Sequence, residues 1–153
     1  MPPPSTDLHV EGPGFDPASV LSDLHDAVDA VLADFAELED WGPSGGRADQ
    51  YASDVVADEA VHRVFAPAGY GVLSEESGLR LPSVDGAPTV VVDPLDGSTN
   101  ASRGLPWYAT SLCAVDEEGP WVAVVVDLVV GTRYDAVRGW GARRDAEPIR
   151  RDD

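Results

Sequence analysis

The sequence predicts an α+β fold in which two N-terminal helices pack on a mostly antiparallel sheet. Between residues 16 and 65, apolar residues recur at helical spacing. From residue 71 onward they instead form short β-branched runs, separated by turns rich in glycine and proline. A helical period followed by a series of strand-like runs is typical of α+β layers, and the short connections favour antiparallel neighbours.

The first helix is predicted after residues 1–14, a segment rich in proline and glycine that we expect to be flexible. Asp16 is a good N-cap residue, and Pro17 suits the first helical position. The apolar residues that follow share one helical face: Val20, Leu21, Leu24, Val28, Val31, Leu32 and Phe35. We therefore expect one folded domain over residues 15–153, with this helix packed against its core.

The second helix is predicted from Ser53 or Asp54 to Phe65, because the segment 41–46 (Trp-Gly-Pro-Ser-Gly-Gly) breaks the first one. Asp54 lies in the first turn, where the helix dipole favours a negative charge. Its simplest role is therefore to cap the helix. His62 is expected to be an ordinary surface residue.

Five strand-like runs account for most of the remaining chain: residues 71–74, 89–92, 109–115, 121–130 and 132–137. Pro94 is expected to end the second run, because proline fixes φ and lacks the N–H that a sheet needs. After Gly141 the sequence is polar and charged, and we expect a tail there rather than further strands.

Composition excludes several classes of function. A net charge of −18 and a pI near 4.2 argue against a general binder of nucleic acid or anionic membranes, since both need a basic surface. Cys113 is the only cysteine, so no intramolecular disulfide is expected, and its apolar surroundings predict a small core residue. No signal-like or membrane-spanning pattern is present, so we expect a cytoplasmic protein.

The segment 93–100 (Asp-Pro-Leu-Asp-Gly-Ser-Thr-Asn) carries the strongest chemical signal. Asp93 and Asp96 follow a β-branched strand and offer the hard oxygen ligands that Mg²⁺ prefers. The backbone N–H groups of Gly97 and Ser98 could bind phosphate oxygens. An EF-hand and a P-loop both fail on spacing, because the glycine is at position five and no Gly-Lys-Ser/Thr is present. An ordinary surface turn remains an alternative on chemistry alone.

This segment resembles the signature of the inositol monophosphatase family, which comprises Mg²⁺-dependent, lithium-sensitive phosphatases. Two further stretches support the resemblance. Residues 73–78 (Leu-Ser-Glu-Glu-Ser-Gly) are similar to the family's upstream metal motif, and Asp54 with Asp58 resembles its earlier helix start. The resemblance implies the N-terminal half of a layered αβαβα fold.

Roles for individual residues follow from this resemblance. It implies that Glu75, Asp93 and the Leu95 carbonyl hold a first Mg²⁺, with Asp93 and Asp96 contributing to a second. Ser98, where threonine is usual, would orient the attacking water together with Asp54 and Glu75. The substrate phosphate would be bound by Asp96 and by the amides of Gly97 and Ser98.

The family's C-terminal α/β half, with its Trp-Asp-x-x-Ala-Gly motif, has no counterpart after Trp140, which is followed by glycine. The expected function is hydrolysis of inositol phosphate or a similar small phosphate monoester. The alternative is a catalytically weak or inactive half that binds Mg²⁺ and phosphate or acts as an interaction partner. The expected partners are a small phosphorylated substrate and either a second copy of the chain or a complementary C-terminal half. An exposed apolar sheet face is expected where that half would pack.

Overall fold

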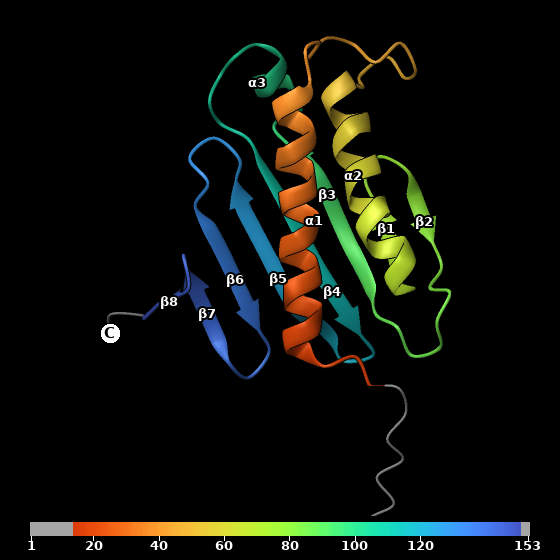
Figure 1. Cartoon of the computed structure of the whole chain (residues 1–153), viewed down its shortest axis with the longest axis vertical. Coiled ribbons are helices and arrows are strands. Elements are labelled where there is room, and N and C mark those ends of the chain that lie inside the picture. Colours follow the sequence, from red (N-terminus) through yellow and green to blue (C-terminus); the bar gives the residue numbers. More distant parts are fainter. Residues whose placement is uncertain (1–13, 151–153) are drawn as a thin grey trace, which may run out of the picture.

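A computed structural model describes residues 14–150, which form one layer of helices on one sheet. Helices α1 (Pro17–Glu37) and α2 (Ala52–Ala68) lie side by side across the front of the sheet in Figure 1. The sheet has the strand order β2-β1-β3-β4-β5-β6-β7-β8. Strands β1 and β3 are parallel and every other neighbouring pair is antiparallel, which confirms the predicted α+β class.

Helix α1 forms for the reasons that its sequence gives. The Asp16 carboxylate accepts hydrogen bonds of 3.0 Å from the N–H groups of Ala18 and Ser19, as expected of an N-cap. Six side chains of its apolar stripe are buried: Val20, Leu21, Leu24, Ala27, Val28 and Val31. Helix α2 runs one turn past the predicted Phe65 and ends at Gly69, whose φ of 78° is left-handed.

The strands are β1 (Gly71–Ser74), β2 (Gly78–Arg80), β3 (Thr89–Asp96), β4 (Ala109–Asp116), β5 (Gly119–Asp127), β6 (Arg133–Val137), β7 (Gly141–Arg144) and β8 (Glu147–Pro148). A short helix, α3 (Ser98–Ser102), follows β3 directly. The parallel pair sets the geometry of the site. Ser74 is the partner of Val92, so the residues that follow these strands emerge together at one edge of the sheet.

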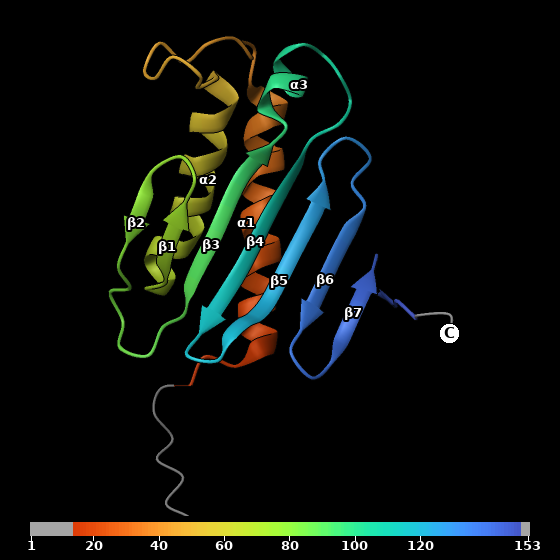
Figure 2. The ribbon, with the colours of Figure 1, turned by 180° about the vertical axis from the view of Figure 1, so that it is seen from behind.

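The two faces of the sheet have different surroundings. The covered face lies under α1 and α2 and includes Val90, Leu112 and Val124, all buried. The open face is turned toward the viewer in Figure 2, and no helix or loop of residues 14–150 crosses its strands. Val91 and Val125 point to this face and are each 41% exposed, so the expected exposed apolar surface is present.

The expectation that Pro94 ends its strand is wrong. Strand β3 continues to Asp96, and its pairing with β4 shifts register between Asp93 and Asp96. Strand β1 ends at Ser74, so this part of β3 has lost its neighbour on one side and needs no N–H there. The Pro94 carbonyl accepts a 2.7 Å hydrogen bond from the Thr110 hydroxyl, which fixes the irregular segment.

The expected charged tail also forms strands. Arg138 to Trp140 make a turn, and β7 and β8 then extend the sheet. Polar contacts stabilise these strands. The Arg143 guanidinium, for example, donates a 2.7 Å hydrogen bond to Asp135 of β6. Cross-strand charge pairs give no apolar alternation, so hydropathy did not indicate these strands.

Cys113 is half-buried on the open face of β4 rather than in the core, which corrects its predicted position. Within residues 14–150, no helix combines the length and apolar character needed to cross a membrane.

Candidate functional site

The structure brings Glu75 and Asp93 together at the carboxyl ends of the parallel strands. The Glu75 N–H donates a 3.1 Å hydrogen bond to the Val92 carbonyl and so continues the β1–β3 pairing by one residue. Burial raises the pKa of Asp93 to about 6, and the negative charges of Glu75 and Asp96 act in the same direction. Glu75 and Asp93 line the same hollow on the open face, next to Ser74 and Val92. Asp93 is half-buried, whereas Glu75 and Asp96 are exposed, and neighbouring carboxylates of this kind favour a bound cation.

Asp54 reaches the same edge from the first turn of α2. Its side chain is almost fully buried, and one carboxylate oxygen accepts a 2.8 Å hydrogen bond from the Tyr51 N–H. Burial raises the pKa of Asp54, with smaller contributions from the charges of Glu76 and Glu75. Hydrogen bonds from the Tyr51 N–H and the Ser98 side chain oppose this shift. Asp54 therefore caps α2, as its position predicted, and also lies next to Ser98.

The turn between β3 and α3 depends on Gly97. This residue is the N-cap of α3 and has a φ of 87°. A Cβ atom there would lie 2.8 Å from the Trp107 carbonyl oxygen, closer than real contacts allow. Glycine is therefore required both by the left-handed backbone and by the approach of the 103–108 segment. Helix α3 has only five residues, so phosphate binding here would depend on individual N–H groups more than on a helix dipole.

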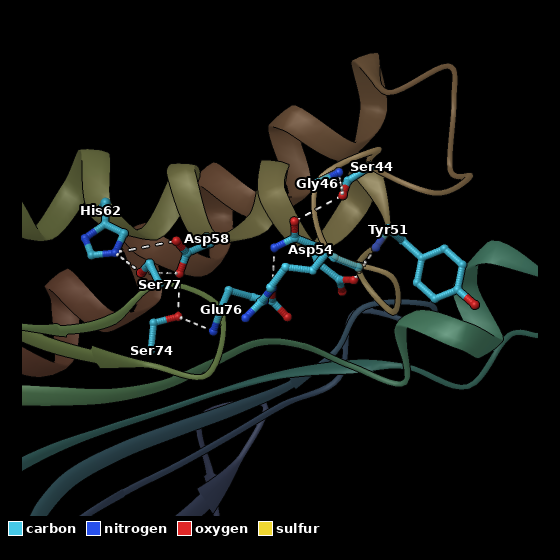
Figure 3. Close-up of polar contacts among 11 residues, drawn as sticks. Ser44, Gly46, Tyr51, Asp54, Asp58, His62, Ser74, Glu76 and Ser77 are labelled. Carbon is cyan, nitrogen blue, oxygen red and sulfur yellow. Dashed lines mark hydrogen bonds and ion pairs between the residues drawn. The ribbon is translucent and has the colours of Figure 1, made fainter.

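A cluster around Asp58 joins α2 to the turn that carries Glu75. We define the Asp58 cluster as Asp58, His62, Ser74 and Ser77 (Figure 3). Asp58 is buried, and one carboxylate oxygen accepts hydrogen bonds from the hydroxyls of Ser74 and, at 3.2 Å, Ser77. Ser74 also accepts a 3.1 Å hydrogen bond from the Glu76 N–H. These contacts fix the backbone on both sides of Glu75.

The neighbouring Glu76 is tied to the loop before α2 instead. Its carboxylate forms an ion pair with Arg47 and accepts a 2.7 Å hydrogen bond from the Gln50 side chain. Gln50 is held in turn by Ser44, whose hydroxyl donates a 3.1 Å hydrogen bond to it. Of the two adjacent glutamates, Glu76 is thus occupied by structural contacts, while Glu75 lines the same hollow as Asp93.

His62 is not the ordinary surface residue that the sequence predicted. Its Nε2 lies 2.8 Å from the Ser77 hydroxyl and 3.6 Å from an Asp58 oxygen, and its side chain is 19% exposed. Its Nδ1 is buried and has no hydrogen-bond partner among the described residues. A Ser-His-Asp relay needs the two partners on different ring nitrogens, so this trio is not a nucleophilic triad. The spacing of residues 54, 58 and 62, one helical turn apart, is the signal that could have identified this polar stripe.

The remaining predicted ligands lie at the same edge of the sheet. Leu95 packs its side chain into the core, and Asp96 is exposed at the end of β3. Within residues 14–150, no group of three or more His, Cys, Asp or Glu side chains converges to hold a metal ion. Glu75 and Asp93 do supply two neighbouring carboxylates, and Mg²⁺ commonly takes only one or two, with water and substrate completing its shell. The available donor groups therefore fit Mg²⁺, although the ligand set is not assembled in advance.

Several known proteins are similar to this chain. The sequence profile of the Inositol monophosphatase family matches residues 46–153. A fructose-1,6-bisphosphatase/inositol-1-monophosphatase of Thermococcus kodakarensis is 38% identical over 99 residues, which cover 63% of this chain and 37% of that protein. An inositol-1-monophosphatase of Rhizobium meliloti is 37% identical over 121 residues, which cover 74% of this chain and 44% of that protein.

The fold is similar to that of solved structures as well. A Pyrococcus horikoshii protein, PH1897, described as having similarities to inositol-1 monophosphatase, superposes with a TM-score of 0.71 at 26% identity. The superposition covers 87% of this chain and 55% of that one. The chain thus spans well under half the length of these two curated relatives and about half that of this structure. On the sequence profile and the shared fold, the chain belongs to the inositol monophosphatase family.

Proposed function

We propose that this chain carries the metal- and phosphate-binding wall of a Mg²⁺-dependent phosphomonoesterase that hydrolyses inositol phosphate or a similar small phosphate ester. The placement of Glu75 and Asp93 side by side, one residue beyond the paired Ser74 and Val92, is the observation that carries the proposal. Neighbouring negative charges beside the half-buried Asp93 are unfavourable without a cation, and a bound Mg²⁺ would relieve that repulsion. Family membership supports the same chemistry.

In this proposal Glu75, Asp93 and the Leu95 carbonyl hold one Mg²⁺, and Asp93 and Asp96 contribute to a second. When bound, Mg²⁺ supplies Lewis-acid stabilisation of charge on the phosphoryl oxygens. The Glu75 turn stays in place because the Asp58 cluster holds it on one side.

The remaining residues act on water and phosphate. Ser98 is near enough to Asp54 to lower the pKa of its carboxyl, so its hydroxyl can orient an attacking water together with Asp54 and Glu75. The N–H groups of Gly97 and Ser98 would bind the phosphate oxygens, with Asp96 beside them. Serine retains the hydroxyl of the threonine that is usual in the family, so this role is preserved.

Release of inorganic phosphate from inositol 1-phosphate, and binding of Mg²⁺ by calorimetry, test the proposal together. We expect Asp93→Asn to abolish both any Mg²⁺-dependent release and specific Mg²⁺ binding. Asp85→Asn is the matched control, because Asp85 is an exposed aspartate in the connection between β2 and β3. Equal Mg²⁺ affinity in the chain and in Asp93→Asn would contradict the proposal.

The open face favours a second candidate function. Leu73, Val91 and Val125 are each more than 40% exposed on it, and exposed apolar surface of this kind favours association. The alternative is therefore a catalytically weak half that binds Mg²⁺ and phosphate and pairs through this face with a second copy or with a complementary chain. A monodisperse monomer in light scattering at micromolar concentration would count against this alternative.

A further inference from the structure

A cavity of about 390 Å³ lies next to the proposed phosphate-binding turn. Asp96 and Gly97 form one of its walls, and the opposite wall comes from β5 and β6 at the open face. Its size is within the range of small-molecule binding sites. Glu75, Asp93 and Ser98 do not line this cavity, so their proposed roles do not account for it.

The aromatic side of the cavity is fixed relative to the phosphate turn. The Trp107 carbonyl approaches Gly97 and also accepts a 2.9 Å hydrogen bond from the Asn100 side chain. The Leu128 N–H donates a 3.2 Å hydrogen bond to the Tyr108 carbonyl, which ties the next residue to the end of β5. Trp107 is nevertheless 80% exposed, so its backbone is fixed beside the turn while its aromatic side chain is left uncovered.

The register of the sheet sets the distance from the carboxylates to the far wall. Asp93, Ser111, Val125 and Tyr134 are successive partners across β3, β4, β5 and β6, so they form one row on the open face. Three strand spacings separate Asp93 from Tyr134, which is about 14 Å. A phosphate held near Asp93 and Gly97 would thus leave room for a ring attached directly to the ester oxygen.

The negative charge of the cavity lining disfavours a ligand that carries a second anionic group besides its phosphate. Asp96 and Asp127 contribute carboxylates, and none of the described residues that line the cavity is arginine or histidine. The chain contains no lysine. Arg144 lies 5.9 Å from the centre of the Tyr134 ring but does not line the cavity. A ligand with a second phosphate or a carboxylate would therefore meet negative charge without a cation to balance it.

We propose that this cavity binds the alcohol part of the phosphate ester, and that this alcohol is uncharged and carries a planar aromatic ring that stacks on Trp107. The phosphate position rests on the proposed function. Aromatic side chains stack well on planar rings, and Val125 and Ala109 supply an apolar floor for such a ring. A polyol has no ring of this kind and would use the cavity poorly.

Binding of 1-naphthyl phosphate and of inositol 1-phosphate in the presence of Mg²⁺ tests the inference by calorimetry, with the Trp107 indole N–H followed by NMR. We expect naphthyl phosphate to bind about 10-fold more tightly, as one stacking contact allows. Trp107→Ala should weaken the binding of naphthyl phosphate about 10-fold and so remove this difference. Trp140→Ala is the matched control, since Trp140 is also an exposed tryptophan, 65% accessible, at the β6–β7 turn.

A phosphate-free probe, 1-naphthol, separates this inference from the proposed function. Naphthol should shift the Trp107 signal equally in the chain and in Asp93→Asn. If ester binding is independent of Mg²⁺ and of Asp93 while naphthol still shifts the Trp107 NMR signal, the phosphatase proposal fails and the ring site stands. If ester binding needs Mg²⁺ and Asp93 but Trp107→Ala changes neither ester, the ring site is overturned. Equal or tighter binding of inositol 1-phosphate would overturn it too.

Discussion

The two faces of the sheet are built from alternate residues of the same valine-rich strands, yet one face is buried and the other is partly exposed. In β3, Val90 and Val92 are 0% and 2% exposed, whereas Val91 between them is 41% exposed. In β5, Val124 and Val126 are buried and Val125 is again 41% exposed. Hydrophobicity is therefore the same on both faces, and only the helices α1 and α2 make one of them a core.

This difference separates stability from function in the molecule. The covered face buries its apolar surface against the helices, which is the main source of folding free energy. The open face carries Asp93, Val125 and Tyr134 in one row, so the candidate site and its neighbouring cavity lie on the side that contributes less to the core. Substitutions on the two faces should therefore be separable by experiment.

The largest expected difference is between two leucines of the sheet. Leu112 is 1% exposed on the covered face, and Leu73 is 43% exposed on the open face. Leu112→Ala should lower the free energy of unfolding by about 2–5 kcal/mol, because it leaves a cavity in a packed core. Leu73→Ala should cost less than about 1 kcal/mol. Urea denaturation measures both, and similar costs would mean that the open face is covered in solution.

The Asp58 cluster, at the boundary between the helices and the site, should give the next largest effect. Asp58→Ala leaves the buried Ser74 hydroxyl without its acceptor, at a cost of roughly 2–3 kcal/mol. It should also weaken Mg²⁺ binding, because the Glu75 turn loses its attachment to α2. Glu59→Ala, an exposed neighbour on the same helix, is the control. Unchanged Mg²⁺ affinity in Asp58→Ala would show that the cluster serves stability alone.

Sequence reasoning succeeded where local chemistry decides the structure. Asp16 predicted the start of α1, and the run before Asp93 predicted a strand that ends in a polar turn. It failed where a neighbour decides instead: Pro94 continues its strand because β1 has already ended, and Arg143 pairs through Asp135 without apolar alternation. Cys113 was placed in the core because its run is apolar, but no periodicity says which face a helix covers.

The candidate site shows the same division. Family resemblance, rather than pattern, identified Asp54, Glu75, Asp93 and Ser98 as one group, and the structure places them at one edge of the sheet. Their individual roles stay predictions. The contacts of His62 form because the turn after β1 folds back onto α2. Hydrophobic periodicity in a single sequence does not indicate a long-range contact of this kind.

A smaller effect, of opposite sign, is expected at Asp93 without metal. Its pKa is about 6 in the folded chain, above its ordinary value of 3.8, so protonation favours folding. This contribution is fully present below about pH 4 and is lost as the pH rises through 6. In chelator-treated buffer at pH 7.5, Asp93→Asn should therefore raise the free energy of unfolding by roughly 1–2 kcal/mol after allowance for screening. The gain should vanish near pH 4, and a gain independent of pH would contradict this assignment.

The smallest change in stability should come from Val91, compared with its neighbour Val90 given the same substitution. Threonine is close to valine in shape, so it tests the surroundings of each position rather than its volume. Val91→Thr places a hydroxyl where water reaches it, and the free energy of unfolding should change by less than about 0.5 kcal/mol. Val90→Thr buries the same hydroxyl under the helices, without an evident partner, and should cost about 1–3 kcal/mol. If the open face also mediates association, Val91→Thr should shift the equilibrium toward monomer in light scattering. Equal stability losses at the two positions would mean that the open face is packed as tightly as the covered one, and would turn the comparison toward an assembled state.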